Sequence, residues 1–471
     1  MDDYKVTVGI EVHAELKTNT KIFSSSLNGY ANMANTNVNV IDLGYPGTLP
    51  TINKEVINKG IVAATVLNCD ISKRMHFDRK NYFYPDLPKG YQITQSRTPI
   101  GINGYVEIDV DGTPKKIRIH DIHIEEDTCK SMHYNNSSLL DFNRAGVPLV
   151  EIVTEADMSS SKEAVLYLEK LRELLLYADV SDCKIEEGSM RCDVNVSISK
   201  TEKLGTKIEV KNIGSISNVG IAIEKEIIRQ KELLEKGEVL HEETRRFDEK
   251  TNSTILMRVK ETGNDYRYFP EPDIPFVELS DDYIEEVKNT IPMLASTRRE
   301  IYLKSGISEV NANKIIQNRK VSDYLNKYIS KNINLIIASN LLLGDIASYL
   351  NKTNLSMEDT KFNEEKFIKV VTMLEKSEIS SKIFKEILTD LFETDDEVKT
   401  LLDKHGISSL SDDDLRNIIK NILDNNKDNV TDYKNGNERV LKFFVGQIMK
   451  ETKGSANPGL VNQMLLEELS K

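Results

Sequence analysis

The sequence of 471 residues lacks the features that mark exported, membrane-spanning and disulfide-bonded proteins. Its four cysteines form no CxxC pair, so we expect neither a disulfide framework nor a structural zinc site. No apolar run approaches the roughly 20 residues that a helix needs to cross a bilayer. The N-terminus also lacks a basic segment followed by an apolar core, which an export signal would require. We therefore expect a protein of the reducing cytoplasm that does not bind a membrane.

Common catalytic motifs are missing as well. The sequence has no GxxxxGK[ST] loop and no GxGxxG after a predicted strand, so a bound nucleotide would be held in another way. It has no GxSxG turn or serine-lysine arrangement that indicates a serine hydrolase. Cys129 follows a pair of glutamates and is a candidate nucleophile, but an unreactive small residue is the favoured interpretation.

Acidic side chains outnumber basic ones in the first part of the chain. The net charge of −13 lies almost entirely in residues 1–290, whereas a nonspecific nucleic-acid binder is usually basic. Local patches remain, from Arg298 to Lys331 and from Lys73 to Arg97, where "RKNYFYPDLPKGYQ" mixes basic and aromatic side chains. For each patch the alternative is an ordinary solvated surface.

The hydrophobic pattern predicts an α+β fold followed by helices. Alternation predicts strands, and a period near 3.6 predicts helices at 161–177 and 219–235. The predicted strands are 6–14, 105–110, 115–119, 191–198 and 207–211. The turn "DVDGTP" joins two of these strands as a hairpin, which favours an antiparallel sheet over a doubly wound one. Strand signals end near residue 292, and we predict domains at 1–292, 293–408 and 409–471.

Acidic side chains gather on the polar sides of these strands. In "VGIEVHAEL", Glu11, His13 and Glu15 share one face. Glu151 is unusual because only apolar residues flank it in "PLVEIV", and a buried carboxylate needs a cation, a base or a proton. Carboxylates with one imidazole favour Mg²⁺ or Mn²⁺ over structural zinc. The alternative is that Glu11, Glu15 and Asp193 only form the solvent side of half-buried strands. The residues therefore indicate a metal-dependent enzyme domain without naming its substrate.

Several longer strings occur together along the chain. They are "VGIEVHAELKT", "FDRKNYFYPDLPKGYQITQ", "IHIEEDTCKS", "LLDFNRAGVPLVEIVTEAD", "EEGSMRCDVNVS", "TRRFDE", "RVKE", "DYRYFPEPD" and "VGQIMKETKGSANPGLVNQML". With these strings the sequence resembles the B subunit of the bacterial aspartyl/glutamyl-tRNA amidotransferase, the GatB family. The resemblance covers essentially the whole chain.

The resemblance implies a fold, an activity and partners. The fold is a cradle domain similar to the glutamine synthetase catalytic fold, then a helical domain, then a small tail that resembles YqeY proteins and contacts tRNA. The activity is ATP-dependent phosphorylation of the side-chain carboxylate of Glu-tRNA(Gln) or Asp-tRNA(Asn). Ammonia that the A (glutaminase) subunit releases from glutamine then attacks the acyl phosphate. The partners are this A subunit and a small C subunit.

The same resemblance assigns roles to residues, position by position. It implies metal ligands at Glu11, His13, Glu125, Glu126, Glu151 and Asp193. It implies ATP contacts at Glu11, Asp193, Glu209 and Lys211, and catalysis by Lys80, Glu126 and Glu151. It places Lys80 and Lys89 near the ammonia route and the acyl-acceptor end, and we predict that Tyr82 and Tyr91 form the wall of that route. We expect the tail, with Lys450 and Lys453, and the patch from Arg298 to Lys331 to hold tRNA.

The sequence departs from the family in one place and leaves two alternatives open. Thr128 and Cys129 stand where family members usually have small residues. One alternative is an RNA-binding scaffold whose chemistry lies in a partner. The other is a free-standing ligase that joins small carboxylates to amines. The acidic strands disfavour the first, and the helical modules disfavour the second.

Overall fold

The computed structural model describes residues 4–29, 33–259, 266–406, 412–437, 439–452, 456 and 458–470. It divides into two compact units, residues 1–295 and 296–471. The division lies three residues after the predicted end of the first domain. The other predicted boundary, between 408 and 409, lies outside the described residues.

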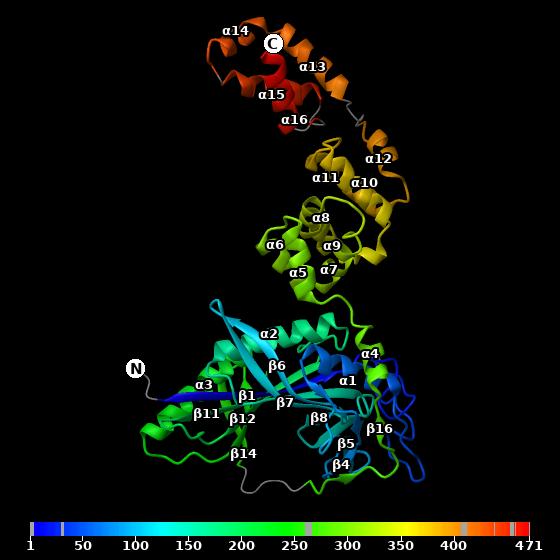
Figure 1. The fold of residues 1–471 in the computed structure, drawn as a ribbon, viewed down its shortest axis with the longest axis vertical. Coiled ribbons are helices and arrows are strands. Elements are labelled where there is room, and N and C mark those ends of the chain that lie inside the picture. The colour runs from blue at the N-terminus through cyan, green and yellow to red at the C-terminus, as the bar shows by residue number, and fades with distance from the viewer. Residues whose placement is uncertain are drawn as a thin grey trace. The chain divides into compact units, whose positions relative to one another are not determined.

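A nine-stranded sheet organises the first unit (Figure 1). Its order is β14 (Ser253–Val259), β13 (Glu243–Asp248), β12 (Ile208–Lys211), β11 (Met190–Ser199), β1 (Lys5–Glu15), β10 (Pro148–Thr154), β7 (Thr113–Glu126), β6 (Gly101–Val110) and β2 (Asp70–Ile71). The long β1 forms because its residues alternate strictly between apolar and polar. The predicted strands therefore belong to one sheet.

Seven of the eight pairings in this sheet are antiparallel, as predicted, but β12 and β13 run parallel. The chain crosses between them through helix α3 (Ile216–Glu235), the kind of long connection that a parallel pair needs. The predicted hairpin joins β6 to β7. Its turn residues Asp111 and Gly112 both have positive φ, 54° and 84°, as in the turns that suit a twisted hairpin.

Helices cover the apolar face of the sheet. These are α1 (Lys54–Val66), α2 (Ser161–Tyr177) and α3, and α4 (Asp281–Lys288) packs on α1. The hydroxyl of Ser160 caps α2 by accepting from the Glu163 backbone N–H. Val8, Ile10 and Val12 of β1 point into this layer and are buried. The polar side chains of β1 consequently lie on the opposite face of the sheet.

Smaller sheets complete the unit. Strand β4 (Asp78–Asn81) lies between β5 (Tyr91–Thr94) and β15 (Phe269–Pro270). Two further pairs are β3 (Arg74–Met75) with β16 (Val277–Glu278), and β8 (Lys130–Tyr134) with β9 (Ser137–Asp141). Strand β5 contacts the carboxyl end of β7, where the Ile93 N–H donates to Glu126. Strands β4 and β5 therefore approach the polar face of the large sheet, opposite to α2 (Figure 1).

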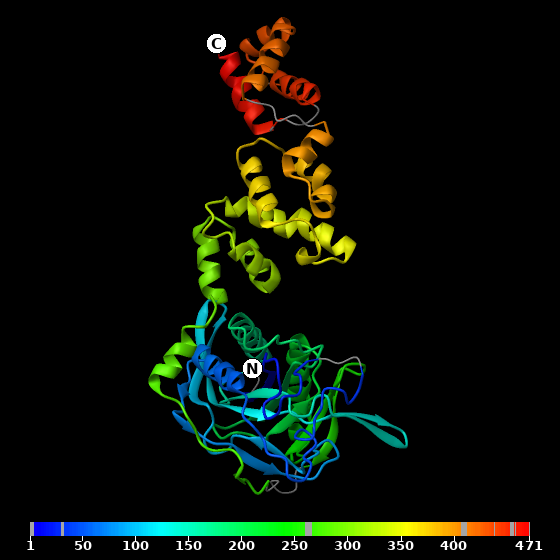
Figure 2. The ribbon, with the colours of Figure 1, turned by 90° about the vertical axis from the view of Figure 1, so that its right-hand side faces the viewer.

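The second unit contains only helices among its described residues (Figure 2). They are α5 (Ala295–Lys304), α6 (Glu309–Gln317), α7 (Arg319–Asn326), α8 (Leu335–Leu341), η1 (Leu342–Ile346), α9 (Ala347–Thr353), η2 (Met357–Asp359), α10 (Glu364–Glu375), α11 (Ser381–Glu393), α12 (Val398–Lys404), α13 (Asp412–Asp424), α14 (Lys427–Lys434), α15 (Val440–Glu451) and α16 (Pro458–Leu469). Helices α13, α15 and α16 share a core that includes Leu415, Phe444 and Val461. None of the described helices is long and apolar enough to cross a bilayer.

Candidate active site

One row of charged side chains crosses four neighbouring strands on the polar face. The register places His123 of β7 opposite Glu151 of β10, Glu151 opposite His13 of β1, and His13 opposite Arg191 of β11. Directly opposed side chains on one face of a sheet are close enough to interact. The period-two alternation of each strand and the antiparallel register together assemble the site from distant parts of the sequence.

The first group of potential ligands is formed by His13, Glu125 and Glu151. The Nε2 atom of His13 lies 3.4 Å from Glu125 Oε1 and 3.3 Å from Glu151 Oε2. One ligand atom from each residue lies within 4.8 Å of the others. Ligand atoms of one octahedral Mg²⁺ are about 3 Å apart, because each lies roughly 2.1 Å from the ion. The spacing therefore suits a small divalent cation.

The charges in this group depend on one another. Burial lowers the pKa of His13, but hydrogen bonds to Glu125 and Glu151 more than offset this and raise it to about 10. Burial raises the pKa of Glu151, but His123 and His13 together hold it well below its usual range. The carboxylate is therefore ionised at neutral pH, the state in which it can bind a cation.

A second group contains Glu11, Asp193 and Glu209, from β1, β11 and β12. Asn195 donates to Glu11 Oε1 at 3.0 Å, and Lys211 forms ion pairs with Asp193 and, at 3.0 Å, with Glu209. Burial raises the pKa of Glu11, and the neighbouring Glu151 raises it further. Three carboxylates this close together would gain stability from a bound cation.

Both groups fit Mg²⁺ or Mn²⁺ by the chemistry of their atoms. The first group offers two carboxylates and one imidazole, and the second offers three carboxylates. No cysteine belongs to either group. The ligands predicted as one set thus fall into two groups, and Glu126 belongs to neither.

Glu126 is instead held by Lys89 and by the backbone. Lys89 Nζ lies 2.6 Å from Glu126 Oε2, and the Ile93 N–H donates to Oε1 at 2.8 Å. Burial raises the pKa of Glu126, and the Lys89 ammonium opposes that increase. Lys89, which precedes β5, therefore docks the β4–β5 segment against the end of β7.

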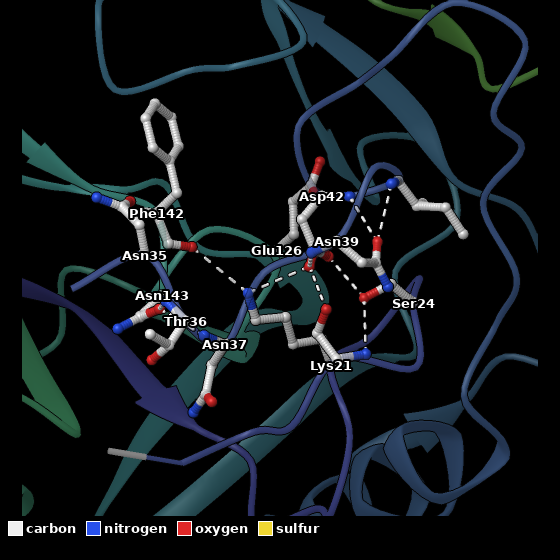
Figure 3. A network of polar contacts seen from close by, with 12 residues as sticks. Lys21, Ser24, Asn35, Thr36, Asn37, Asn39, Asp42, Glu126, Phe142 and Asn143 are labelled. Carbon is white, nitrogen blue, oxygen red and sulfur yellow. Dashed lines mark hydrogen bonds and ion pairs between the residues drawn. The ribbon is translucent and has the colours of Figure 1, made fainter. Parts of the chain in front are cut away.

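A second buried cation stands near Glu126 (Figure 3). Lys21 is fully buried, with Nζ 3.4 Å from Asp42 Oδ2, and it also donates to the Phe142 carbonyl at 3.5 Å. Ser24 and Ser26 each donate to Asp42 at 2.6 Å. This network fixes the segment between β1 and α1 beside the site.

Lys80 faces the first ligand group from β4. Burial lowers its pKa, but the charges of Glu125 and Glu151 contribute to a net increase. Its Nζ lies 5.0 Å from the ring centre of Tyr266, which in turn contacts Tyr82 edge-on. Among the described residues no acceptor lies within hydrogen-bonding distance of this ammonium, so it is held by charge and by an aromatic wall. The ring centre of Tyr91, the fourth predicted channel residue, lies 4.2 Å from the Arg79 guanidinium carbon and 5.6 Å from Lys89 Nζ.

Comparison with known proteins decides the family. The GatB/GatE catalytic domain matches residues 6–285, and a GatB domain matches residues 323–469. Proteins named as the B subunit of aspartyl/glutamyl-tRNA(Asn/Gln) amidotransferase match over 468 residues, 98% of this chain and 98% of each relative. That of Bacillus mycoides (strain KBAB4) is 46% identical, and those of Bacillus cereus (strain B4264) and Bacillus anthracis are 47% identical. The chain belongs to the GatB family.

The basic residues that were expected to contact tRNA differ in solvent exposure in this GatB-family chain. Lys450 is exposed on α15, whereas Lys453 lies outside the described residues. Arg298, expected to belong to a tRNA-binding patch, is instead buried and pairs with Asp323 at 2.6 Å. That expectation was wrong for Arg298 because its charge is used inside the helical unit.

The structure also bears on Cys129 and on His123. Burial raises the pKa of the Cys129 thiol to about 11, which leaves it protonated and supports the unreactive interpretation. His123 was missed as a site residue, although "HDIHIEE" carried a signal. The side chains of residues 121, 123 and 125 project from the same face of β7, because alternate residues of a strand share a face. Glu125 was a predicted ligand, so it could have indicated His123 as its neighbour.

Proposed function

We propose that this chain is the B subunit of a tRNA-dependent aspartyl/glutamyl amidotransferase, a ligase that makes carbon-nitrogen bonds. It would phosphorylate the side-chain carboxylate of Glu-tRNA(Gln), Asp-tRNA(Asn) or both with ATP, and ammonia would then convert the acyl phosphate into an amide. The observation that carries the proposal is the match to amidotransferase B subunits over 98% of the chain, together with the acidic ligand face.

The polar face suits this chemistry. A carboxylate resists attack by ammonia because it is an anion with a poor leaving group, and phosphorylation supplies a good one. Mg²⁺ at the two ligand groups would offset the charge on ATP phosphates during phosphoryl transfer. His13, Glu125 and Glu151 would hold one ion, and Glu11, Asp193 and Glu209 the other.

The basic residues beside the ligands would serve the substrate carboxylate. The Lys80 ammonium, with no acceptor of its own among the described residues, would attract the carboxylate and then the acyl phosphate. Tyr82 and Tyr266 would restrict water around it, which protects both the acyl phosphate and ammonia. Lys89 and Glu126 would line the route by which ammonia arrives.

The remaining parts would serve assembly and tRNA binding in the cytoplasm. We assign a cradle similar to glutamine synthetase to residues 1–292, a helical domain to 293–408 and a YqeY-like tail to 409–471. The A subunit would supply ammonia by hydrolysing glutamine, and the C subunit would join the other two. Lys450 and Lys453 of the tail would contact the tRNA backbone.

The decisive experiment uses the complex with its two partner chains. We expect Glu151→Ala to abolish Mg²⁺-dependent ATP cleavage and amidation while tRNA binding persists. Glu155→Ala is the matched control, since Glu155 directly follows β10, the strand that carries Glu151, but pairs with the exposed His120. ATP cleavage by Glu151→Ala at the normal rate would place the chemistry in a partner and leave this chain as an RNA-binding scaffold. Assays with both misacylated tRNAs identify the substrate.

A further inference from the structure

Behind Glu151 lies a hydrogen-bonded pair that the proposed chemistry has not used. His123 Nε2 is 2.8 Å from Glu151 Oε2, and His123 Nδ1 is 2.9 Å from Asp121 Oδ1. Asp121 and His123 are both on β7, two residues apart, so they project from the same face. The three side chains form a continuous line that ends at the first ligand group.

His123 differs from His13 in what its nitrogens can do. Both ring nitrogens of His123 are within hydrogen-bonding distance of carboxylate oxygens, so neither offers a lone pair to a metal ion. The Nε2 atom of His13 is 3.3 and 3.4 Å from its two carboxylate neighbours, a spacing that accommodates an ion between them. His13 is therefore placed to bind a cation, and His123 is placed to hold a ligand.

We propose that Asp121 and His123 are positioning residues that fix the Glu151 carboxylate for a divalent cation. The proposal rests on the proposed function, because that function places the cation at Glu151. A carboxylate accepts about four hydrogen bonds, so the bond from His123 leaves lone pairs for an ion. Asp121 fixes the imidazole ring, and the ring fixes the plane of the carboxylate.

Orientation matters because a carboxylate on a free side chain loses rotational freedom when it binds an ion. Partners behind metal ligands typically contribute 10- to 100-fold in metal affinity. Glu151 is only 13% exposed and His123 only 15%, so water cannot readily replace His123 as the partner. Loss of His123 should therefore weaken cation binding without removing a ligand.

The test measures Mn²⁺ binding to the full chain without ATP, by the electron paramagnetic resonance signal of free Mn²⁺. We expect His123→Leu to bind Mn²⁺ at the Glu151 site about 10- to 100-fold more weakly, and Asp121→Asn more weakly by a smaller factor. His133→Leu is the matched control, because His133 is exposed on β8 and its ring hydrogen-bonds to the Ser138 hydroxyl and not to a carboxylate. It should bind like the wild type.

A second readout separates positioning from catalysis. In the assembled complex, the variants should need more Mg²⁺ for half-maximal amidation, and saturating Mg²⁺ should restore most of kcat. A residue needed only for folding would not give this pattern. Circular dichroism checks the fold, and Asp121→Asn alone decides the case if His123→Leu does not fold.

Each outcome is distinct. Glu151→Gln is expected to lose this Mn²⁺ site. Unchanged Mn²⁺ binding in Glu151→Gln would show that no cation binds there, which overturns both the cation assignment and this inference. Loss of the site in Glu151→Gln, with wild-type affinity in the folded His123 and Asp121 variants, would overturn the inference alone and leave the proposed function standing.

Discussion

The Lys89–Glu126 ion pair shows how enclosed charges constrain the site at the residue scale. The side chains are 10% and 7% exposed, so neither charge is well hydrated. Removing one partner of such a pair leaves a buried charge, which costs about 3 kcal/mol or more, whereas removing both costs less. We expect Lys89→Met to lower the free energy of unfolding by about 3 kcal/mol and the double variant with Glu126→Gln to recover at least half.

Urea unfolding of the full chain measures both variants. The single Glu126→Gln variant completes the cycle and gives the coupling between the two side chains. If the double variant is as unstable as Lys89→Met, packing of the lysine stem, and not the unpaired charge, explains the loss.

The raised pKa of Glu15 predicts how the free energy of unfolding changes with pH. Burial, and then the charge of Asp127, raise its pKa to about 7, although Arg191 and Arg144 oppose this. The folded state therefore holds the proton more tightly than the unfolded state. The stabilisation is complete below pH 4.5 and is lost as the pH rises through 7.

A neutral side chain at position 15 should remove this loss. We expect Glu15→Gln to be more stable than the wild type by about 2 kcal/mol at pH 8 and equal to it near pH 4.5. Unfolding midpoints of both proteins across this range check the difference. A constant difference at every pH would show that Glu15 titrates normally.

Candidate site residues could be predicted from the sequence only where the residues next to them along the chain showed a clear pattern. Glu151 was identifiable because apolar residues flank it, and Glu11 and His13 because β1 alternates. The contact between Lys80 and Tyr266 could not be predicted in this way. It depends on β15 pairing with β4, a strand far earlier in the chain, and no local pattern encodes that pairing.

At the scale of elements, turn chemistry was the more reliable signal. Asp111 and Gly112 predicted the β6–β7 hairpin because both adopt positive φ, which their residue types tolerate. The parallel β12–β13 pair was missed because β12 has only four residues and its direction relative to β13 depends on how α3 packs. Local sequence thus predicts the sharp connections better than the long crossovers.

Helix α11 depends on a lysine from another helix. Lys366 of α10 is buried and donates to the Leu391 carbonyl at 3.2 Å and the Thr394 carbonyl at 2.5 Å. Carbonyls at a helix end lack partners within the helix, and a cation there also favours the helix dipole. We expect Lys366→Met to destabilise the helical unit by about 2 kcal/mol.

The same helix provides the control. Lys369 is exposed on α10, so Lys369→Met should change stability by less than about 0.5 kcal/mol. Thermal unfolding followed by circular dichroism compares the two variants. Equal effects would show that Lys366 contributes through its aliphatic stem and not through the two carbonyls.

For the whole molecule, the distribution of charge limits where tRNA can bind. The chain has a net charge of −13 and carries acidic groups on its large sheet, so long-range attraction to RNA is weak. The proposed tRNA binding would therefore depend on local cations, and the burial of Arg298 removes one of these. The exposed Lys450 of α15 remains available for a backbone contact.

This argument predicts a specific kinetic change. We expect Lys450→Glu combined with Lys453→Glu to raise KM for Glu-tRNA several-fold, with kcat unchanged, because neither lysine belongs to the ligand groups that would perform the chemistry. Each lost phosphate contact should lower the slope of affinity against salt concentration by about one. Lys369→Glu combined with Lys382→Glu is the control, because both lysines are exposed, on α10 and α11, and the double variant reverses the same amount of charge outside the tail. If the double variant keeps its KM and its salt slope, these lysines do not contact tRNA, and the cradle and the remaining helices must hold the substrate without them.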